Sequence, residues 1–156
     1  MQAVVLLSDL LSAARVKVPL AAATKDALLD ELVDLLVQDE CVDDPEEVLR
    51  VVREREAILS TGIGSGIAIP HGKTPVCGGL SIAAGVTTEP VEYDALDGEP
   101  VQLLFLLVGP ETEAGAHIKA LSRISRLVRQ PELRDRLIAA SDGEEFLRAL
   151  REAEQA

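Results

Sequence analysis

One stretch of the chain constrains the fold more than any other: residues 101–108 read Val-Gln-Leu-Leu-Phe-Leu-Leu-Val. Successive side chains of a β-strand point to opposite faces, so a strand that is apolar on both faces must be covered on both. We therefore expect residues 101–108 to form a central strand with helices on each side of its sheet. Residues 80–88 predict a second strand, and residues 16–20 predict a third that Pro19 restricts to an edge.

Helical patterns flank these strands. Thr24 can cap a helix that runs to about residue 39, and Asp44 followed by Pro45 predicts another that ends near residue 59. Helices, then strands, then helices favour an α/β fold with a mixed β-sheet flanked by helices on both faces. With 156 residues, 47% of them apolar, the chain suits a single domain spanning residues 1–156. The three remaining helices are expected over residues 114–129, 131–140 and 143–153.

The charge and the two cysteines limit the class of protein. A formal net charge of −12 repels the phosphate backbone, so nucleic acid is not expected as a partner. Cys41 and Cys77 lack the spacing of a disulfide framework, which favours a reducing compartment. No stretch has the ~20 apolar residues that span a bilayer, and the amino terminus does not resemble a signal peptide. We expect a cytoplasmic protein that does not insert into a membrane.

His71 is the first candidate for chemistry, because it follows the apolar run Ile67-Ala68-Ile69-Pro70 at the expected end of a short strand. Pro70 cannot donate to a sheet ladder, and Gly72 would let the backbone turn away. Taken alone, such a histidine is more often solvated or packed than catalytic.

Arg55 and His117 each lie on an apolar helical stripe. In each helix, the residues of the stripe lie four, seven and eleven positions after its first residue. This spacing places Arg55 on or beside the core-facing side of its helix, and it places His117 on the core-facing side of the helix expected over residues 114–129. A buried guanidinium needs an anion, although Arg55 can also reach solvent or a carboxylate. His117 can equally be a satisfied core residue. The stripes are Val48, Val52, Arg55 and Leu59, and His117, Leu121, Ile124 and Val128.

The glycine-rich segment before His71 suggests a turn that could expose backbone N–H groups to phosphate oxygens, although a plain flexible turn is as good an interpretation. Its candidate phosphate-binding residues are Gly62, Gly64, Ser65 and Gly66. The order of elements does not fit a dinucleotide fingerprint, which needs a strand before the glycines and a helix after them. No histidine or cysteine spacing typical of a metal site is present, so no metal is expected.

These residues resemble the active-site signature of enzyme IIA domains of the fructose/mannitol class in the bacterial sugar phosphotransferase system. The first motif is Arg55-Glu56 followed by residues 60–73, Ser-Thr-Gly-Ile-Gly-Ser-Gly-Ile-Ala-Ile-Pro-His-Gly-Lys. The second is residues 117–127, His-Ile-Lys-Ala-Leu-Ser-Arg-Ile-Ser-Arg-Leu. The resemblance covers about residues 5–150 and implies the same mixed sheet with helices on both sides.

The resemblance also implies roles. His71 matches the phosphorylated histidine, His117 the second active-site histidine, and Arg55 the arginine near the phosphate. The implied protein is a phosphocarrier without cofactors that takes a phosphoryl group from an HPr-like phosphohistidine protein and passes it to an enzyme IIB-type acceptor in sugar uptake. Two alternatives remain: a nitrogen-regulatory IIA that signals through phosphorylation-dependent binding of a target protein, and a non-catalytic anion-binding domain.

Overall fold

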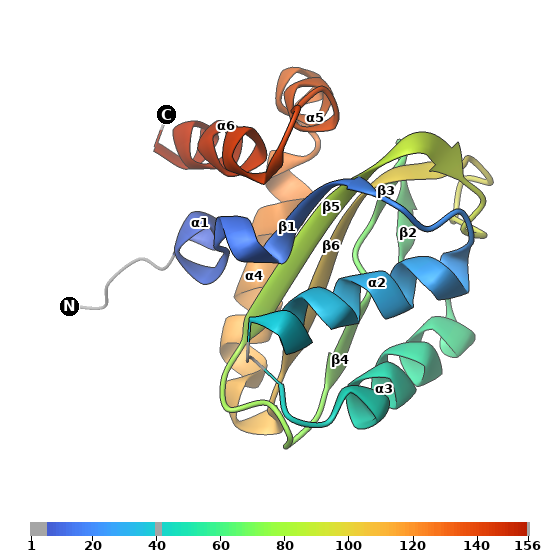
Figure 1. Ribbon diagram of the computed structural model, residues 1–156, viewed down its shortest axis with the longest axis vertical. Helices are drawn as coiled ribbons and strands as arrows, with labels where there is room; N and C mark the ends of the chain where they lie inside the picture. Colours follow the sequence, from blue (N-terminus) through green and yellow to red (C-terminus); the bar gives the residue numbers. More distant parts are fainter. Residues whose placement is uncertain (1–5, 40–41, 156) are drawn as a thin grey trace.

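The computed structural model describes residues 6–39 and 42–155, and it has a mixed six-stranded sheet with helices on both faces, as expected (Figure 1). Strand β6 is central: it pairs antiparallel with β5 and parallel with β3 and β4. Strand β1 pairs with β5 at the edge, where Pro19 was predicted to place it. The strands are β1 (Val16–Leu20), β2 (Gly62–Gly64), β3 (Ile67–Ala68), β4 (His71–Lys73), β5 (Ser81–Val91) and β6 (Val101–Gly109).

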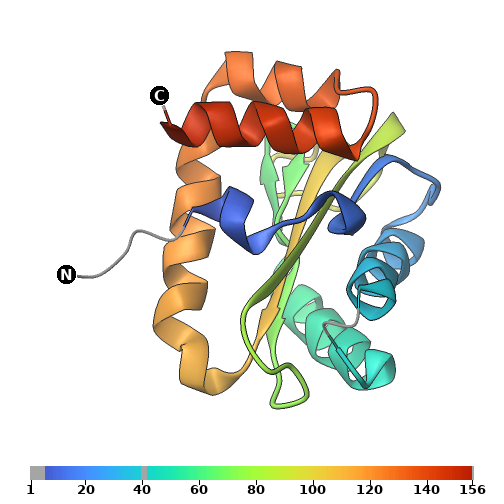
Figure 2. The same cartoon turned by 60° about the vertical axis from the view of Figure 1, so that its left-hand side comes forward.

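Among the described residues, two α-helices cover one face of the sheet and four lie on the other, an arrangement that can be followed in Figures 1 and 2. The first pair is α2 (Lys25–Gln38) and α3 (Pro45–Ile58). On the opposite face lie α1 (Leu7–Leu10), α4 (Ala114–Leu127), α5 (Pro131–Ile138) and α6 (Gly143–Gln155). No helix in the described ranges is both long and apolar enough to cross a membrane.

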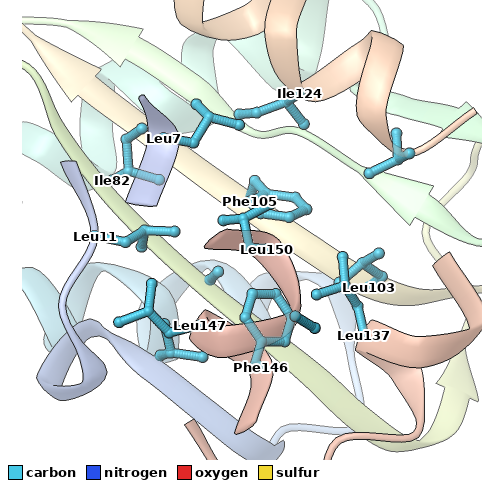
Figure 3. Packing of buried hydrophobic residues seen from close by; sticks show 14 of the residues in the cluster. Leu7, Leu11, Ile82, Leu103, Phe105, Ile124, Leu137, Phe146, Leu147 and Leu150 are labelled. Carbon is cyan, nitrogen blue, oxygen red and sulfur yellow. The ribbon is translucent and has the colours of Figure 1, made fainter. Parts of the chain in front are cut away.

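The side chains of β6 divide between two buried clusters, which confirms the prediction for residues 101–108. Leu103, Phe105 and Leu107 pack toward the four-helix face, where the Phe105 ring lies 5.9 Å from that of Phe146 (Figure 3). Leu104, Leu106 and Val108 pack toward α2 and α3. Each such burial contributes roughly 1.5–3 kcal/mol, so this one strand fixes both layers.

The predicted helix starts are confirmed. The Thr24 hydroxyl accepts a hydrogen bond from the Ala27 amide at 3.2 Å, and the Asp44 carboxylate accepts one from the Glu47 amide at 3.1 Å. Each bond satisfies an amide that the first helical turn leaves without a partner. Cys77 is buried; Cys41 lies outside the described residues.

Two local predictions are wrong. The glycine segment is a hairpin rather than a turn alone, because β2 pairs antiparallel with β3 and only the residues at its tip have positive φ. Leu59 does not continue the core-facing stripe of α3: it is extended and 55% exposed, because the helix ends at Ile58.

Candidate functional site

His71 begins β4, and the strand continues through Gly72 instead of turning away as predicted. A Cβ at Gly72 would lie 2.9 Å from the Val51 Cγ2 atom, so the glycine lets α3 pack closely against the strand. Because neighbouring residues of a strand face opposite sides, His71 points away from α3, toward the layer that contains α4. Its backbone pairs with Leu107 of β6, whose side chain belongs to the buried cluster on that same face.

The His71 ring is held in one tautomer. Its Nδ1 atom lies 2.9 Å from the Ile69 carbonyl oxygen, which can only accept, so Nδ1 carries the proton and Nε2 keeps a free lone pair. Burial lowers the pKa of His71; the bond to Ile69 opposes this shift, and the positive charges of Arg55 and Lys73 lower the pKa further. The imidazole is therefore neutral at pH 7, with a nucleophilic nitrogen.

His117 meets this ring from α4. The two ring centroids lie 5.5 Å apart at an interplanar angle of 64°. His117 is only 2% exposed, and neither of its ring nitrogens has a hydrogen-bond partner among the described residues. Burial, followed by the charges of His71 and Lys73, lowers its pKa from 6.5 to about 4. A buried imidazole without partners is costly, which points to a ligand that it would bind.

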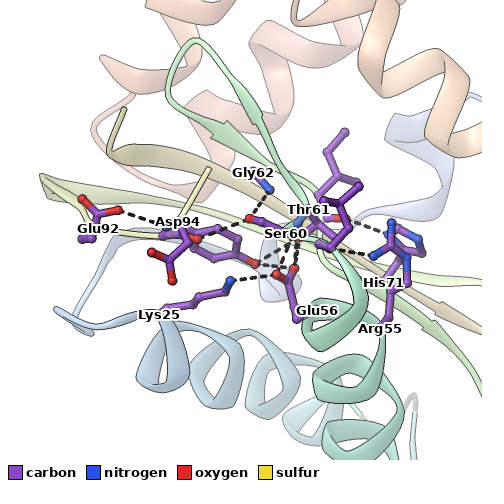
Figure 4. A network of polar contacts seen from close by, with 12 residues as sticks. Lys25, Arg55, Glu56, Ser60, Thr61, Gly62, His71, Glu92 and Asp94 are labelled. Atoms are coloured by element: carbon purple, nitrogen blue, oxygen red, sulfur yellow. Dashed lines mark hydrogen bonds and ion pairs between the residues drawn. The ribbon is translucent and has the colours of Figure 1, made fainter. Parts of the chain in front are cut away.

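Arg55 lies beside the core-facing stripe of α3, half-buried, and close enough to affect the pKa of His71. Its Nη1 donates to the Leu59 carbonyl oxygen at 2.7 Å, which directs the guanidinium past the helix end (Figure 4). Arg55 forms no ion pair with a carboxylate within residues 6–39 and 42–155. Arg55 is thus close enough to His71 for its charge to act on that ring, and the His71 ring in turn lies against that of His117.

Two charged residues near the site were missed as functional candidates. Lys73 lies on the same face of β4 as His71, and its charge lowers the pKa of both histidines. Its position two residues after a candidate histidine on a strand was the available signal. Glu56, which occupies the buried position of α3 next to Arg55, raises the pKa of His71.

Glu56 is the centre of a buried polar network (Figure 4). Its carboxylate accepts hydrogen bonds from the Thr61 hydroxyl and amide and from the Tyr93 hydroxyl at 3.0 Å. It also pairs with Lys25 at 3.0 Å, and the Lys25 ammonium lies 4.5 Å from the centre of the Tyr93 ring. Burial raises the pKa of Tyr93, and the Glu56 carboxylate raises it further. The network joins α2, α3 and the end of β5 to the segment that leads into His71.

The structure does not bring the tip of the glycine hairpin to His71. The hairpin enters β3, where Ile67 pairs with Leu103, whereas His71 pairs with Leu107, and four strand residues span about 13 Å. The Ser65 amide already donates to Asp97 at 3.1 Å, and the Gly62 amide donates to the Ser60 hydroxyl. Gly64 and Gly66 have positive φ and close the hairpin. We leave these four residues out of the site around His71.

No group of three or more histidine, cysteine or acidic side chains in the described part of the chain could hold a metal ion. The site instead collects two imidazoles, a guanidinium and an ammonium. His117, Arg55 and Lys73 can each donate a hydrogen bond near the free Nε2 lone pair of His71. This arrangement suits a phosphoryl group on that nitrogen.

Residues 9–153 match the family model for the phosphoenolpyruvate-dependent sugar phosphotransferase system, EIIA 2. A fructose-specific EIIA component from Haloferax volcanii is 36% identical over 118 residues, which are 76% of this chain and 77% of that protein. A nitrogen regulatory protein from Pseudomonas aeruginosa is 33% identical over 138 residues, covering 88% of this chain and 90% of that protein. A fructose-specific EIIABC component from Bacillus subtilis is 35% identical over 134 residues; these are 86% of this chain but only 21% of that protein.

Solved structures similar to this chain are also of enzyme IIA proteins. Nitrogen regulatory protein IIA-Ntr from Neisseria meningitidis superposes with a TM-score of 0.86 and 33% identity, covering 92% of this chain and 98% of that one. Enzyme IIA-mannitol from Escherichia coli, in a complex with phosphorylated enzyme IIB-mannitol, gives a TM-score of 0.78 at 21% identity, over 91% and 97% of the two chains. The second likeness concerns the fold alone.

Proposed function

The chain belongs to the EIIA type-2 family of the phosphoenolpyruvate-dependent sugar phosphotransferase system, and on that premise we propose that it is a phosphocarrier with His71 as the phosphorylated residue. One observation carries the proposal. The free Nε2 atom of His71 lies beside a buried imidazole, His117, whose two nitrogens have no partner within the described residues. A phosphoryl group on Nε2 would supply an acceptor oxygen for His117.

In the proposed step, the Nε2 lone pair of His71 attacks the phosphorus of a donor phosphohistidine. The new N–P bond forms as the donor N–P bond breaks, and the departing imidazole keeps the electron pair of that bond. His71 retains its Nδ1 proton on the Ile69 carbonyl throughout, so the attacking nitrogen has no proton to lose. Transfer to an acceptor is the same step in reverse, for which imidazole is both a good nucleophile and a good leaving group.

The surrounding charges act mainly by position, because phosphoryl transfer leaves little covalent work for the protein. We assign Arg55 and Lys73 to neutralise the phosphoryl oxygens, and His117 to donate a hydrogen bond to one of them. A charge-assisted hydrogen bond contributes roughly 1.5–3 kcal/mol, which is enough to shift a transfer that runs near equilibrium.

Exposed apolar side chains near the site support a protein donor and a protein acceptor. Ile58 is 80% exposed at the end of α3, and Ile118 is 63% exposed next to His117, so apolar side chains lie beside the site on two sides. Gly115, which has no side chain, and Ala116 are exposed as well, so a partner could approach the backbone closely there. We propose an HPr-like phosphohistidine protein as donor and an enzyme IIB-type protein as acceptor in sugar uptake, in line with the fructose-specific relatives.

Phosphorylation-dependent regulation is the second candidate role. It is favoured by the match to the nitrogen regulatory protein over 90% of that protein's length and by the TM-score of 0.86 to IIA-Ntr. In this role the same phosphoryl group on His71 would change which target protein binds, and onward transfer to a IIB-type acceptor would be absent.

The test is incubation of the full chain with a phosphorylated HPr-like protein that carries radioactive phosphate. We expect acid-labile, alkali-stable label on the wild type and none on His71→Ala, and ¹⁵N NMR of histidine-labelled protein should place the phosphoryl group on Nε2. Arg55→Gln should slow labelling, while Arg53→Gln serves as the matched control on the same helix because Arg53 is exposed and pairs with Asp30.

Label that persists on His71→Ala would overturn the assignment, and absence of label from the wild type would favour a non-catalytic anion-binding domain. Onward transfer to a IIB-type protein separates the two candidate roles. The transport role requires loss of the label when the acceptor is added. A stable label, together with a target captured by only one phosphorylation state, would identify the regulatory role.

A further inference from the structure

A second concave site lies beside β3, at the end of α4 opposite to His117. It is a hollow of about 360 Å³ between the β2–β3 hairpin and the corner where α4 leads into α5. This size is at the small end of the range for metabolite pockets. Its lining includes Ser65, Ile67, Ser125, Val128, Arg129 and Arg134.

Two arginines give the hollow a positive charge in a chain of net charge −12. Arg129 is exposed and follows the end of α4, and Arg134 is half-buried on α5. Neither forms an ion pair with a carboxylate in the described ranges, and the described lining contains no acidic side chain. Arg134 uses one nitrogen, Nη1, to donate to the Val128 carbonyl oxygen at 3.1 Å, which positions its guanidinium at the wall.

The rest of the lining combines an apolar floor with hydroxyl groups. Ile67 and Val128 are both 2% exposed and form the floor, while Ser65 and Ser125 contribute hydroxyls at the wall. The hairpin wall is fixed by Asp97, which accepts the Ser65 amide at 3.1 Å and the Glu99 amide at 3.0 Å. The hollow can therefore bind a ligand with an anionic group, through its arginines and serines, and an uncharged part, through Ile67 and Val128. The backbone of its hairpin wall is already held in place.

This site cannot share an anion with His71. Along β6, the residue paired with Ile67 is four positions from the residue paired with His71, or about 13 Å. Along α4, Ser125 lies eight residues beyond His117, or about 12 Å, and Arg129 follows the far end of the helix. The two measures agree, so the hollow is separate from the site of the proposed function.

We propose that this hollow binds a small organic phosphate, a phosphate monoester with a short carbon body. The two guanidinium groups and the serine hydroxyls would bind the phosphate oxygens, because arginine matches phosphate geometry with paired N–H donors. The floor of Ile67 and Val128 would contact the carbon body. This inference goes beyond the phosphocarrier role and does not depend on it.

The test is an amide NMR titration of the full chain with glycerol 3-phosphate, with glycerol and inorganic phosphate as comparison ligands. We expect saturable shifts at residues 63–67 and 125–134, no such shifts with glycerol, and weaker binding of inorganic phosphate because it lacks the carbon body. Arg129→Gln should weaken binding by about 5- to 10-fold, the effect of losing one partly exposed charged contact. Arg126→Gln is the matched control, because this exposed α4 arginine does not line the hollow.

Three results would overturn the proposal: no saturation at these residues, shifts confined to the surroundings of His71 and His117, or equal weakening by the two arginine variants. His71→Ala separates this proposal from the phosphocarrier role. It should abolish phosphorylation and leave glycerol 3-phosphate binding within twofold of wild type. Substitutions at distant sites usually act independently to within about 0.4 kcal/mol, which corresponds to this twofold range. Loss of hollow binding in His71→Ala would show that the two sites are one.

Discussion

The buried histidine on α4 predicts an acid sensitivity that a single substitution should remove. His117 has a pKa of about 4 in the folded protein, against 6.5 for an ordinary histidine. Its folded pKa is the lower one, so between these values the unfolded chain binds more protons than the folded chain does. Through His117 the folded protein therefore loses unfolding free energy as the pH falls below about 6.5, and the loss is complete below about pH 4.

The size of the effect follows from the two pKa values. At pH 5 almost every unfolded molecule carries a proton on His117, whereas only about one folded molecule in ten does. The folded protein should lose about 2 kcal/mol of unfolding free energy between pH 7 and pH 5 from this residue alone. The side chain is 2% exposed, so solvent screening does not reduce this figure much.

Urea denaturation of the wild type and of His117→Gln at pH 7 and pH 5 measures the difference. Carboxylates and His71 titrate in both proteins, so their contributions largely cancel in the comparison. The drop in unfolding free energy should be about 2 kcal/mol smaller in the variant, with unchanged dependence on urea. His117→Leu, which also cannot titrate, should behave like His117→Gln and guards against an effect specific to glutamine.

Parallel pH profiles for the wild type and both variants would refute the reasoning, because they would mean that His117 is protonated as easily in the folded protein as in the unfolded one. A direct NMR titration of the His117 ring gives an independent check. Its midpoint should lie well below 6.5 and should rise when His71 is phosphorylated, since a nearby phosphate favours the charged imidazole.

Three further substitutions test the framework around the site. Asp44→Ala should lower the unfolding free energy by about 1 kcal/mol in urea denaturation, because it removes the cap of α3. Gly72→Ala should cost about 1–3 kcal/mol and slow single-turnover phosphorylation, because its Cβ would lie 2.9 Å from Val51 and push α3 off β4. Glu56→Gln should cost about 2 kcal/mol by leaving Lys25 without its charge partner, and adding Lys25→Met should restore part of that loss if the pairing is the cause.

The parts of the fold that the sequence predicted are those set by local chemistry. The apolar run at 101–108 required cover on both faces, and the caps at Thr24 and Asp44 began helices within one residue of the expected positions. His117 was predicted to share a buried stripe with Ile124 and Val128, and all three are buried. Such patterns depend on residues a few positions apart, which one sequence displays directly.

What the sequence could not predict depends on contacts between distant segments. The role of Gly72 comes from the approach of α3, and nothing in its neighbours distinguishes a packing glycine from a turn glycine. The buried network of Glu56 could not be predicted, because its partners Lys25 and Tyr93 are 31 and 37 residues away. The distance between the tip of the glycine hairpin and His71 has the same origin, since strand pairing sets them four residues apart along β6.

His117 is in an unfavourable state in this structure, which bears on the proposed function. A buried polar group without a partner costs about 1–3 kcal/mol, and α4 cannot turn His117 outward without pulling Ile124 and Val128 from the core. A phosphoryl oxygen on His71 would supply the missing acceptor, so phosphorylation would remove a cost that folding imposes. If His71 is the phosphorylated residue, the equilibrium with a phosphohistidine donor would therefore be displaced toward phosphorylated His71.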